Sequence, residues 1–182
     1  AYSSVEHMGI LALGVGLGGN AVFGAMLHTV NHSLAKAMLF LLAGNILQHY
    51  RTTSSHDVCG MRRTMPLTAA LWTAGFLAIT GSPPFGLFVS EFSILLAMLQ
   101  QGRGVIAFLY LGFLAAIFVG MSVPVLRMVQ ASPPSGLKKT YRATLLNTGP
   151  PCVLCALVLM LGLYVPPWIT QGLRAAAKAL GG

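Results

Sequence analysis

The sequence predicts an all-α fold, a polytopic bundle of about six transmembrane helices in which one helix is broken by proline and glycine. Of its 182 residues, 55% are hydrophobic and only 8% are charged, whereas a soluble domain carries about 25% charged residues. Several apolar runs approach the length of about 20 residues that crosses a bilayer. Polar stretches or clusters of proline and glycine separate these runs, as is typical of an integral membrane protein.

We expect membrane segments at residues 4–18, 20–50, 66–80, 84–101, 105–129 and 149–165, which together form one transmembrane bundle over residues 1–165. The second segment is long enough to cross the bilayer with tilt. Polar residues at 51–65 and 131–148 predict two exposed connections. Residues 166–182 form a predicted interfacial amphipathic tail, because Arg174 and Lys178 lie four residues apart and Trp168 suits the headgroup region.

The formal net charge of +8 does not indicate a nucleic-acid partner. The basic residues fall mostly between the apolar runs, which is where membrane topology places them. Cys152 and Cys155 have no second cysteine pair or acidic ligands near them in the sequence, so we interpret them as small apolar helix residues. We therefore expect no metal and no cofactor in this chain.

A stripe of ionisable side chains lies within the second segment. His28, His32 and Lys36 follow one another at intervals of four residues, which places them on one face of a helix. An ionisable group at bilayer depth costs roughly 2.5–3.5 kcal/mol on insertion scales, so the stripe should face protein or water. Because histidine exchanges protons near neutral pH, we interpret the stripe as part of a proton-transfer path.

Glu91 is the second candidate for proton transfer. Burial favours the neutral form of a carboxyl group and a nearby positive charge favours the ionised form, so such a group can load and release a proton. Glu91 could instead tie two helices together as an ion-pair partner, and a single histidine could be a packing residue. Glu6 and His7, near the start of the first segment, are possible proton-transfer or entry residues, with capping or interfacial roles as the alternative.

A helix break is predicted from Gly81, Pro83, Pro84 and Gly86. The prolines remove two backbone donors and the glycines allow unusual dihedral angles. Non-helical backbone is tolerated at membrane depth only where it is buried in protein or lines a cavity. We therefore expect the break to be buried, with an ordinary loop at the membrane surface as the alternative.

Three stretches have motifs of a known family. They are AYSSVEHMG at residues 1–9, HTVNHSLAKAMLF at residues 28–40 and GSPPFGLFVSEF at residues 81–92. These stretches resemble the antiporter-like subunits of respiratory complex I and its relatives. They are most similar to the large proton-pumping subunit of group 4 membrane-bound hydrogenases, the hydrogenase-4 component F type. The resemblance covers about residues 1–130.

The resemblance implies a fold built from two inverted repeats of transmembrane helices, of which this chain would hold most of the second repeat and the terminal helix. It also implies that His28, His32 and Lys36 belong to a central hydrophilic axis. Glu91 would be the terminal proton-transfer carboxylate on the broken helix. The family's redox centres lie in partner subunits, so this chain would be a non-catalytic, proton-pumping subunit of a hydrogenase or NADH:quinone oxidoreductase type of complex.

The expected partners are the lipid bilayer, other membrane subunits, and a chain or segment that supplies the missing N-terminal repeat. Because the sequence begins at Ala1 inside a motif, we expect a piece of a longer chain or half of a split subunit. A bacterial or archaeal inner membrane is the expected location. Two alternatives remain, a subunit of a multi-subunit cation/proton antiporter and a structural scaffold.

Overall fold

The computed structural model describes residues 2–132, 141 and 144–180, and those residues contain helices and connections but no strand. The predicted all-α fold class is therefore confirmed. In chain order the described helices are α1 (Tyr2–Leu17), α2 (Asn20–Tyr50), α3 (Met61–Thr64), α4 (Pro66–Ile79), α5 (Gly86–Gln100), α6 (Gly104–Gln130), α7 (Leu145–Leu163) and α8 (Pro167–Ala179).

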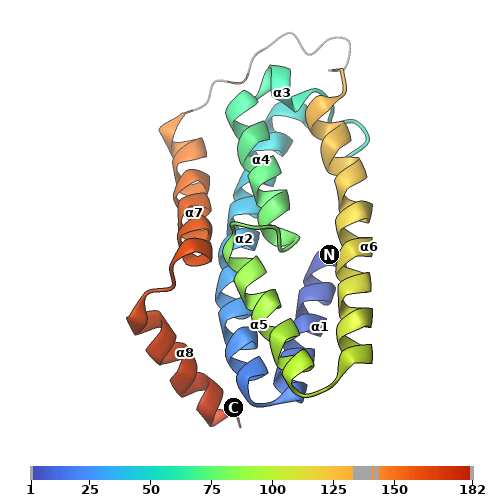
Figure 1. Ribbon diagram of the computed structural model, residues 1–182. Helices are drawn as coiled ribbons and strands as arrows, with labels where there is room; N and C mark the ends of the chain where they lie inside the picture. The colour runs from blue at the N-terminus through green and yellow to red at the C-terminus, as the bar shows by residue number, and fades with distance from the viewer. Residues whose placement is uncertain (1, 133–140, 142–143, 181–182) are drawn as a thin grey trace.

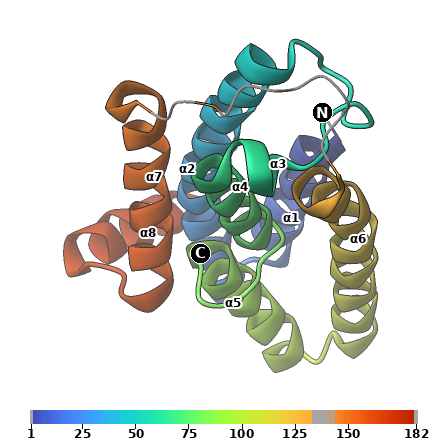
Figure 2. The same cartoon turned by 90° about the horizontal axis from the view of Figure 1, so that it is seen from above.

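The long helix α2 is the centre of the bundle (Figure 1). It contacts α1, α4, α5, α7 and α8, while α6 packs against α3, α4 and α5 on the side away from α7. Viewed from above, α6 and α7 lie on opposite sides of the molecule (Figure 2). The inward-facing residues of α2, among them His28 and Asn31, are consequently enclosed positions for polar groups.

Among the described residues, three helices are long and apolar enough to cross a membrane, namely α2, α6 and α7. The apolar helices α1, α4 and α5 are shorter. Helix α4 lies above α5 in Figure 1, with the non-helical residues 80–85 between them. These two short helices therefore form the two halves of the predicted broken helix.

Helix α7 begins at Leu145 and not at residue 149, because Pro150 and Pro151 lie inside the helix and do not mark its start. Pro151 has no N–H to donate to the carbonyl of Asn147, its normal helical acceptor. The side chain of Asn45 on α2 takes over this role, since its Nδ2 donates to that carbonyl at 2.7 Å. A neighbouring helix thus replaces the hydrogen bond that proline removes.

The connection over residues 51–65 is only partly exposed, contrary to the prediction. It contains the one-turn helix α3, and Val58 and Met61 are buried together with Ile46 of α2 and Met128 of α6. Its apolar residues pack against the bundle while Arg62 and Arg63 remain exposed. The other predicted connection, 131–148, overlaps the start of α7, and its residues 133–140 and 142–143 lie outside the described residues.

Candidate functional site

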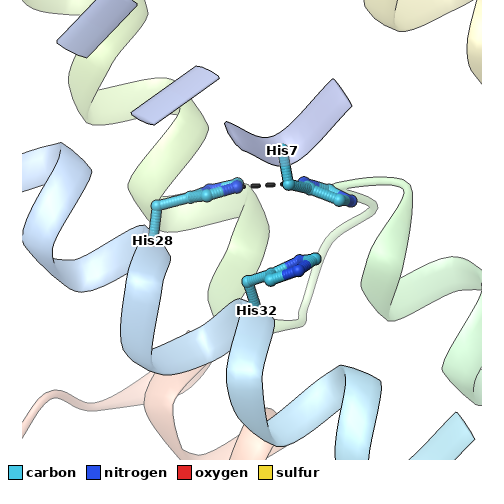
Figure 3. Close-up of side chains that lie close together, drawn as sticks. All are labelled: His7, His28 and His32. Atoms are coloured by element: carbon cyan, nitrogen blue, oxygen red, sulfur yellow. Dashed lines mark hydrogen bonds between the residues drawn. The ribbon is translucent and has the colours of Figure 1, made fainter. Parts of the chain in front are cut away.

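Three histidines from two helices meet in the interior of the bundle (Figure 3). His7 comes from α1, and His28 and His32 come from successive turns of α2. Their exposed fractions are only 1%, 0% and 6%. His7 Nδ1 lies 3.0 Å from His28 Nε2, and the ring centroids of His7 and His32 are 4.3 Å apart. The sequence-predicted pair on α2 is thus joined by a third ring.

Ser90 of α5 extends this group on the far side of His28. Its Oγ lies 3.0 Å from His28 Nδ1 and 2.8 Å from the carbonyl oxygen of Leu87. Both ring nitrogens of His28 therefore have hydrogen-bond partners. By contrast, His7 Nε2 and His32 Nδ1 are buried without a hydrogen-bond partner among the described residues, so each can still accept or donate.

Lys36 lies one turn beyond His32 and is half-buried. The stripe predicted from the sequence thus runs from two buried imidazoles to a partly exposed ammonium group. Glu6 precedes His7 on α1, is also half-buried, and lines a cavity of about 380 Å³ together with residues of α1 and α6. The structure brings His7 into contact with the stripe and places Glu6 beside the cavity.

The helix break is packed against neighbouring helices. Asn31 of α2 is fully buried and its Nδ2 donates to the carbonyl of Gly86 at 3.0 Å. The backbone at Pro84 packs against Gly162 of α7 so closely that a Cβ there would overlap it. Phe85 is buried, although the side chains of Pro83 and Pro84 are exposed. These contacts favour a break held inside the protein over a surface loop.

Glu91 lies directly behind this break. Its side chain is 5% exposed, and its carboxylate packs against Gly81, where a Cβ would overlap it. Among the described residues, no donor hydrogen-bonds to its buried Oε1. The carboxylate also borders a cavity of about 290 Å³. Glu91 is therefore an enclosed acid beside a cavity, and no ion pair joins it to another residue in the described part of the chain.

Sequence reasoning missed three polar residues of this region, namely Asn31, Ser90 and Tyr110. Tyr110 of α6 is 7% exposed, and its buried hydroxyl has no hydrogen-bond partner in the described part of the chain. It lines both the cavity that contains Glu91 and the cavity that contains Glu6. The available signal was a hydroxyl in the middle of the apolar run 105–129. This signal is weak, because an uncharged polar group in a membrane segment costs much less free energy than a charged one.

The three histidines also suit a transition metal by ligand type, because they offer nitrogen atoms within 4.8 Å of one another. However, two of the rings already share a hydrogen bond through His7 Nδ1 and His28 Nε2. The ammonium group of Lys36 follows one turn after His32, and its positive charge opposes a nearby dication. The arrangement is better suited to proton exchange than to holding a metal.

Comparisons with known proteins identify relatives of this chain. The chain is 35% identical over 174 residues to a hydrogenase-4 component F homolog of Methylacidiphilum infernorum, covering 94% of this chain and 35% of that protein. It is 36% identical over 106 residues to NADH-quinone oxidoreductase subunit N of Desulforudis audaxviator, covering 58% of this chain and 21% of that protein. The chain thus spans about a third or less of these relatives.

A solved structure of the Mrp complex from Dietzia sp. shares the fold. The match has a TM-score of 0.80 at 22% identity and covers 99% of this chain and 41% of that chain. Residues 1–119, which include the three histidines, the helix break and Glu91, match the family model described as NADH:quinone oxidoreductase/Mrp antiporter, TM. This chain therefore belongs to that family of antiporter-like integral membrane subunits.

Proposed function

We propose that this chain is a proton-translocating membrane subunit, or part of one, in a complex I-like or membrane-bound hydrogenase assembly. The proton-transfer residues of this axis are His28, His32, Lys36 and Glu91, to which His7 is added. The observation that carries this proposal is the buried contact of His7 with His28 and His32. The redox chemistry that drives transfer takes place in other subunits.

The chemistry of the group favours the proton over a metal cation as the transferred ion. An imidazole can accept a proton at one nitrogen while it releases one from the other. The distances of 3.0 Å from His7 to His28 and from His28 to Ser90 are within hydrogen-bond reach. Hard cations instead prefer several oxygen ligands, which these imidazoles and Lys36 do not offer.

The partners follow from the extent of the chain. Its relatives are about three times as long, so another chain or segment supplies the remaining repeat and completes the path across the membrane. The names of the relatives point to coupling with hydrogenase or NADH:quinone oxidoreductase subunits. A bacterial or archaeal inner membrane is the proposed location, and no redox cofactor binds to this chain.

The test is proton uptake by vesicles that contain the whole assembly. Glu91→Gln keeps the shape of the side chain but removes its titrating proton, so we expect normal assembly and a loss of uptake of about a hundredfold, the lower end for loss of an acid–base group. Glu91→Asp should keep partial uptake because it still titrates. Asp57→Asn is the control, because Asp57 is exposed in the connection after α2. This substitution should leave proton uptake unchanged.

Full proton uptake by Glu91→Gln would exclude an obligatory proton-carrying role for this carboxylate. A requirement for sodium in place of a redox substrate would favour the cation/proton antiporter, the second candidate, which the Mrp part of the family description supports. If the double variant Lys36→Ala, Glu91→Ala took up protons like the wild type, only a structural scaffold role for this chain would remain.

A further inference from the structure

The hydroxyl of Ser90 determines the direction of the hydrogen bonds around His28. A carbonyl oxygen can only accept a hydrogen bond, and a hydroxyl has one proton to give. Ser90 Oγ lies 2.8 Å from the Leu87 carbonyl, so its proton points there. The same oxygen is 3.0 Å from His28 Nδ1 and must then accept, which means that Nδ1 of His28 carries the hydrogen.

This assignment extends to His7. A neutral His28 with hydrogen on Nδ1 has a free lone pair on Nε2. His7 Nδ1 lies 3.0 Å from that atom and is therefore the donor. In the neutral His7 ring the remaining lone pair is on Nε2, which is buried without a partner among the described residues. The hydrogen bonds consequently run in one direction, from His7 through His28 and Ser90 to Leu87.

We propose that Ser90 is a positioning residue that fixes the tautomer of His28, and that His28 thereby serves as a proton store filled through His7. This inference rests on the proposed function and assigns roles within the same site. His32 is the neighbouring ring from which His7 can be loaded, because its Nδ1 is also buried and unpartnered among the described residues and its ring centroid is 4.3 Å from that of His7.

The transfer balances with one proton and no other change in bonding. A proton binds His7 Nε2, and the proton on His7 Nδ1 moves to His28 Nε2. His7 is then neutral with its hydrogen on Nε2, and His28 is an imidazolium ion that donates to His7 and to Ser90. Ser90 accepts from Nδ1 in both states, so its hydrogen bond is never broken.

The store has one opening. The proton of Ser90 faces the Leu87 carbonyl, which cannot pass a proton onward, so the stored proton leaves as it came, through His7. His28 is therefore the closed end of a branch, and the route between Lys36 and Glu91 does not run through Ser90. Without the hydroxyl, His28 would be free to carry its hydrogen on Nε2 and could no longer accept from His7.

The tautomer can be read by ¹⁵N NMR of the histidine-labelled assembly in bilayers above neutral pH. We expect His28, assigned by the loss of its signals in His28→Gln, to have a protonated Nδ1 and an unprotonated Nε2. Ser90→Ala should move the hydrogen to Nε2, and Ser90→Thr should restore the wild-type spectrum. Ser93→Ala is the matched control, because Ser93 on the same helix also donates to a backbone carbonyl, that of Val89 at 2.7 Å.

Proton uptake supplies the second readout. It should fall about tenfold in Ser90→Ala, recover in Ser90→Thr and stay unchanged in Ser93→Ala. A wild-type His28 with hydrogen on Nε2, or a Ser90→Ala spectrum like that of the wild type, would overturn the proposal. Because the tautomer is read without a proton gradient, an assembly with the expected tautomer but no proton uptake would contradict the proposed function and leave the positioning role of Ser90 intact.

Discussion

The carboxylate of Glu91 lies directly against the backbone of Gly81, at the start of the helix break. A Cβ on Gly81 would overlap Oε2 and the carboxyl carbon of Glu91. Gly81 also has a φ of +64°, a conformation that side-chain-bearing residues rarely adopt. The start of the helix break therefore sets the position of the buried acid on α5.

Gly81→Ala should displace the Glu91 carboxylate and reduce proton uptake by about tenfold or more, because small misplacements of a reacting group are costly. The added Cβ must also occupy a left-handed backbone conformation, at a cost of about 1–2 kcal/mol. Gly102→Ala is the matched control, since Gly102 has a φ of +71° with open space around it. Proton uptake and the melting temperature of the purified assembly are the measurements.

Both glycine variants should lose similar stability from their backbone conformation, but only Gly81→Ala should lose transfer. Equal uptake by the two variants would show that the contact between Gly81 and Glu91 does not matter for function. If both glycine variants lost proton uptake, the cause would be the strained backbone conformation and not the displaced carboxylate.

Two buried asparagines on α2 allow stability and function to be separated. Asn31 donates to the Gly86 carbonyl at the break, and Asn45 donates to the Asn147 carbonyl of α7. Asn45→Ala leaves the Asn147 carbonyl without a donor, and Asn31→Ala removes the donor that α2 supplies to the Gly86 carbonyl, so each should cost about 0.5–2 kcal/mol. Only Asn31→Ala should also lower proton uptake, because it frees the start of the helix that carries Ser90 and Glu91.

Thermal denaturation of the assembly measures the first effect and vesicle uptake the second. If Asn45→Ala reduced uptake as strongly as Asn31→Ala, general destabilisation would explain both. A stable Asn31→Ala variant with full uptake would show that the break does not need this hydrogen bond.

The long α2 helix and the alignment of His28 with His32 could be predicted because they depend on local spacing alone. The apolar run gave the bounds 20–50, which the structure reproduces, and residues four apart share a helix face. Glu91 could also be singled out from the sequence, because an acidic side chain in an apolar run is energetically costly.

The contacts between helices could not be predicted from the sequence. His7 could not be joined to His28 because their contact depends on how α1 packs against α2, and spacing along the chain does not encode that packing. Ser90 and Asn31 are uncharged, and their hydroxyl and amide groups became significant only when α5 lay against α2. The prolines of α7 led to a predicted helix start at residue 149. The helix continues through them because Asn45, on α2, supplies the hydrogen-bond donor that Pro151 lacks.

Tyr110 provides the last prediction. Its hydroxyl is buried and unpartnered in the described part of the chain, and it borders the cavity beside Glu91 and the cavity beside Glu6. Tyr110→Phe keeps the ring and removes only this hydroxyl. Because no hydrogen bond among the described residues is lost, stability should be unchanged or rise by up to about 1 kcal/mol.

If the Tyr110 hydroxyl connects the two cavities, Tyr110→Phe should lower proton uptake several-fold in an assembly that is as stable as the wild type. Tyr164→Phe is the control, since Tyr164 is 61% exposed and its hydroxyl borders neither cavity. A Tyr110→Phe assembly with full uptake would assign Tyr110 to packing alone. Because the two acids line separate cavities, a connection between them would then have to form elsewhere, through His7 and the neighbouring ring of His32 on α2.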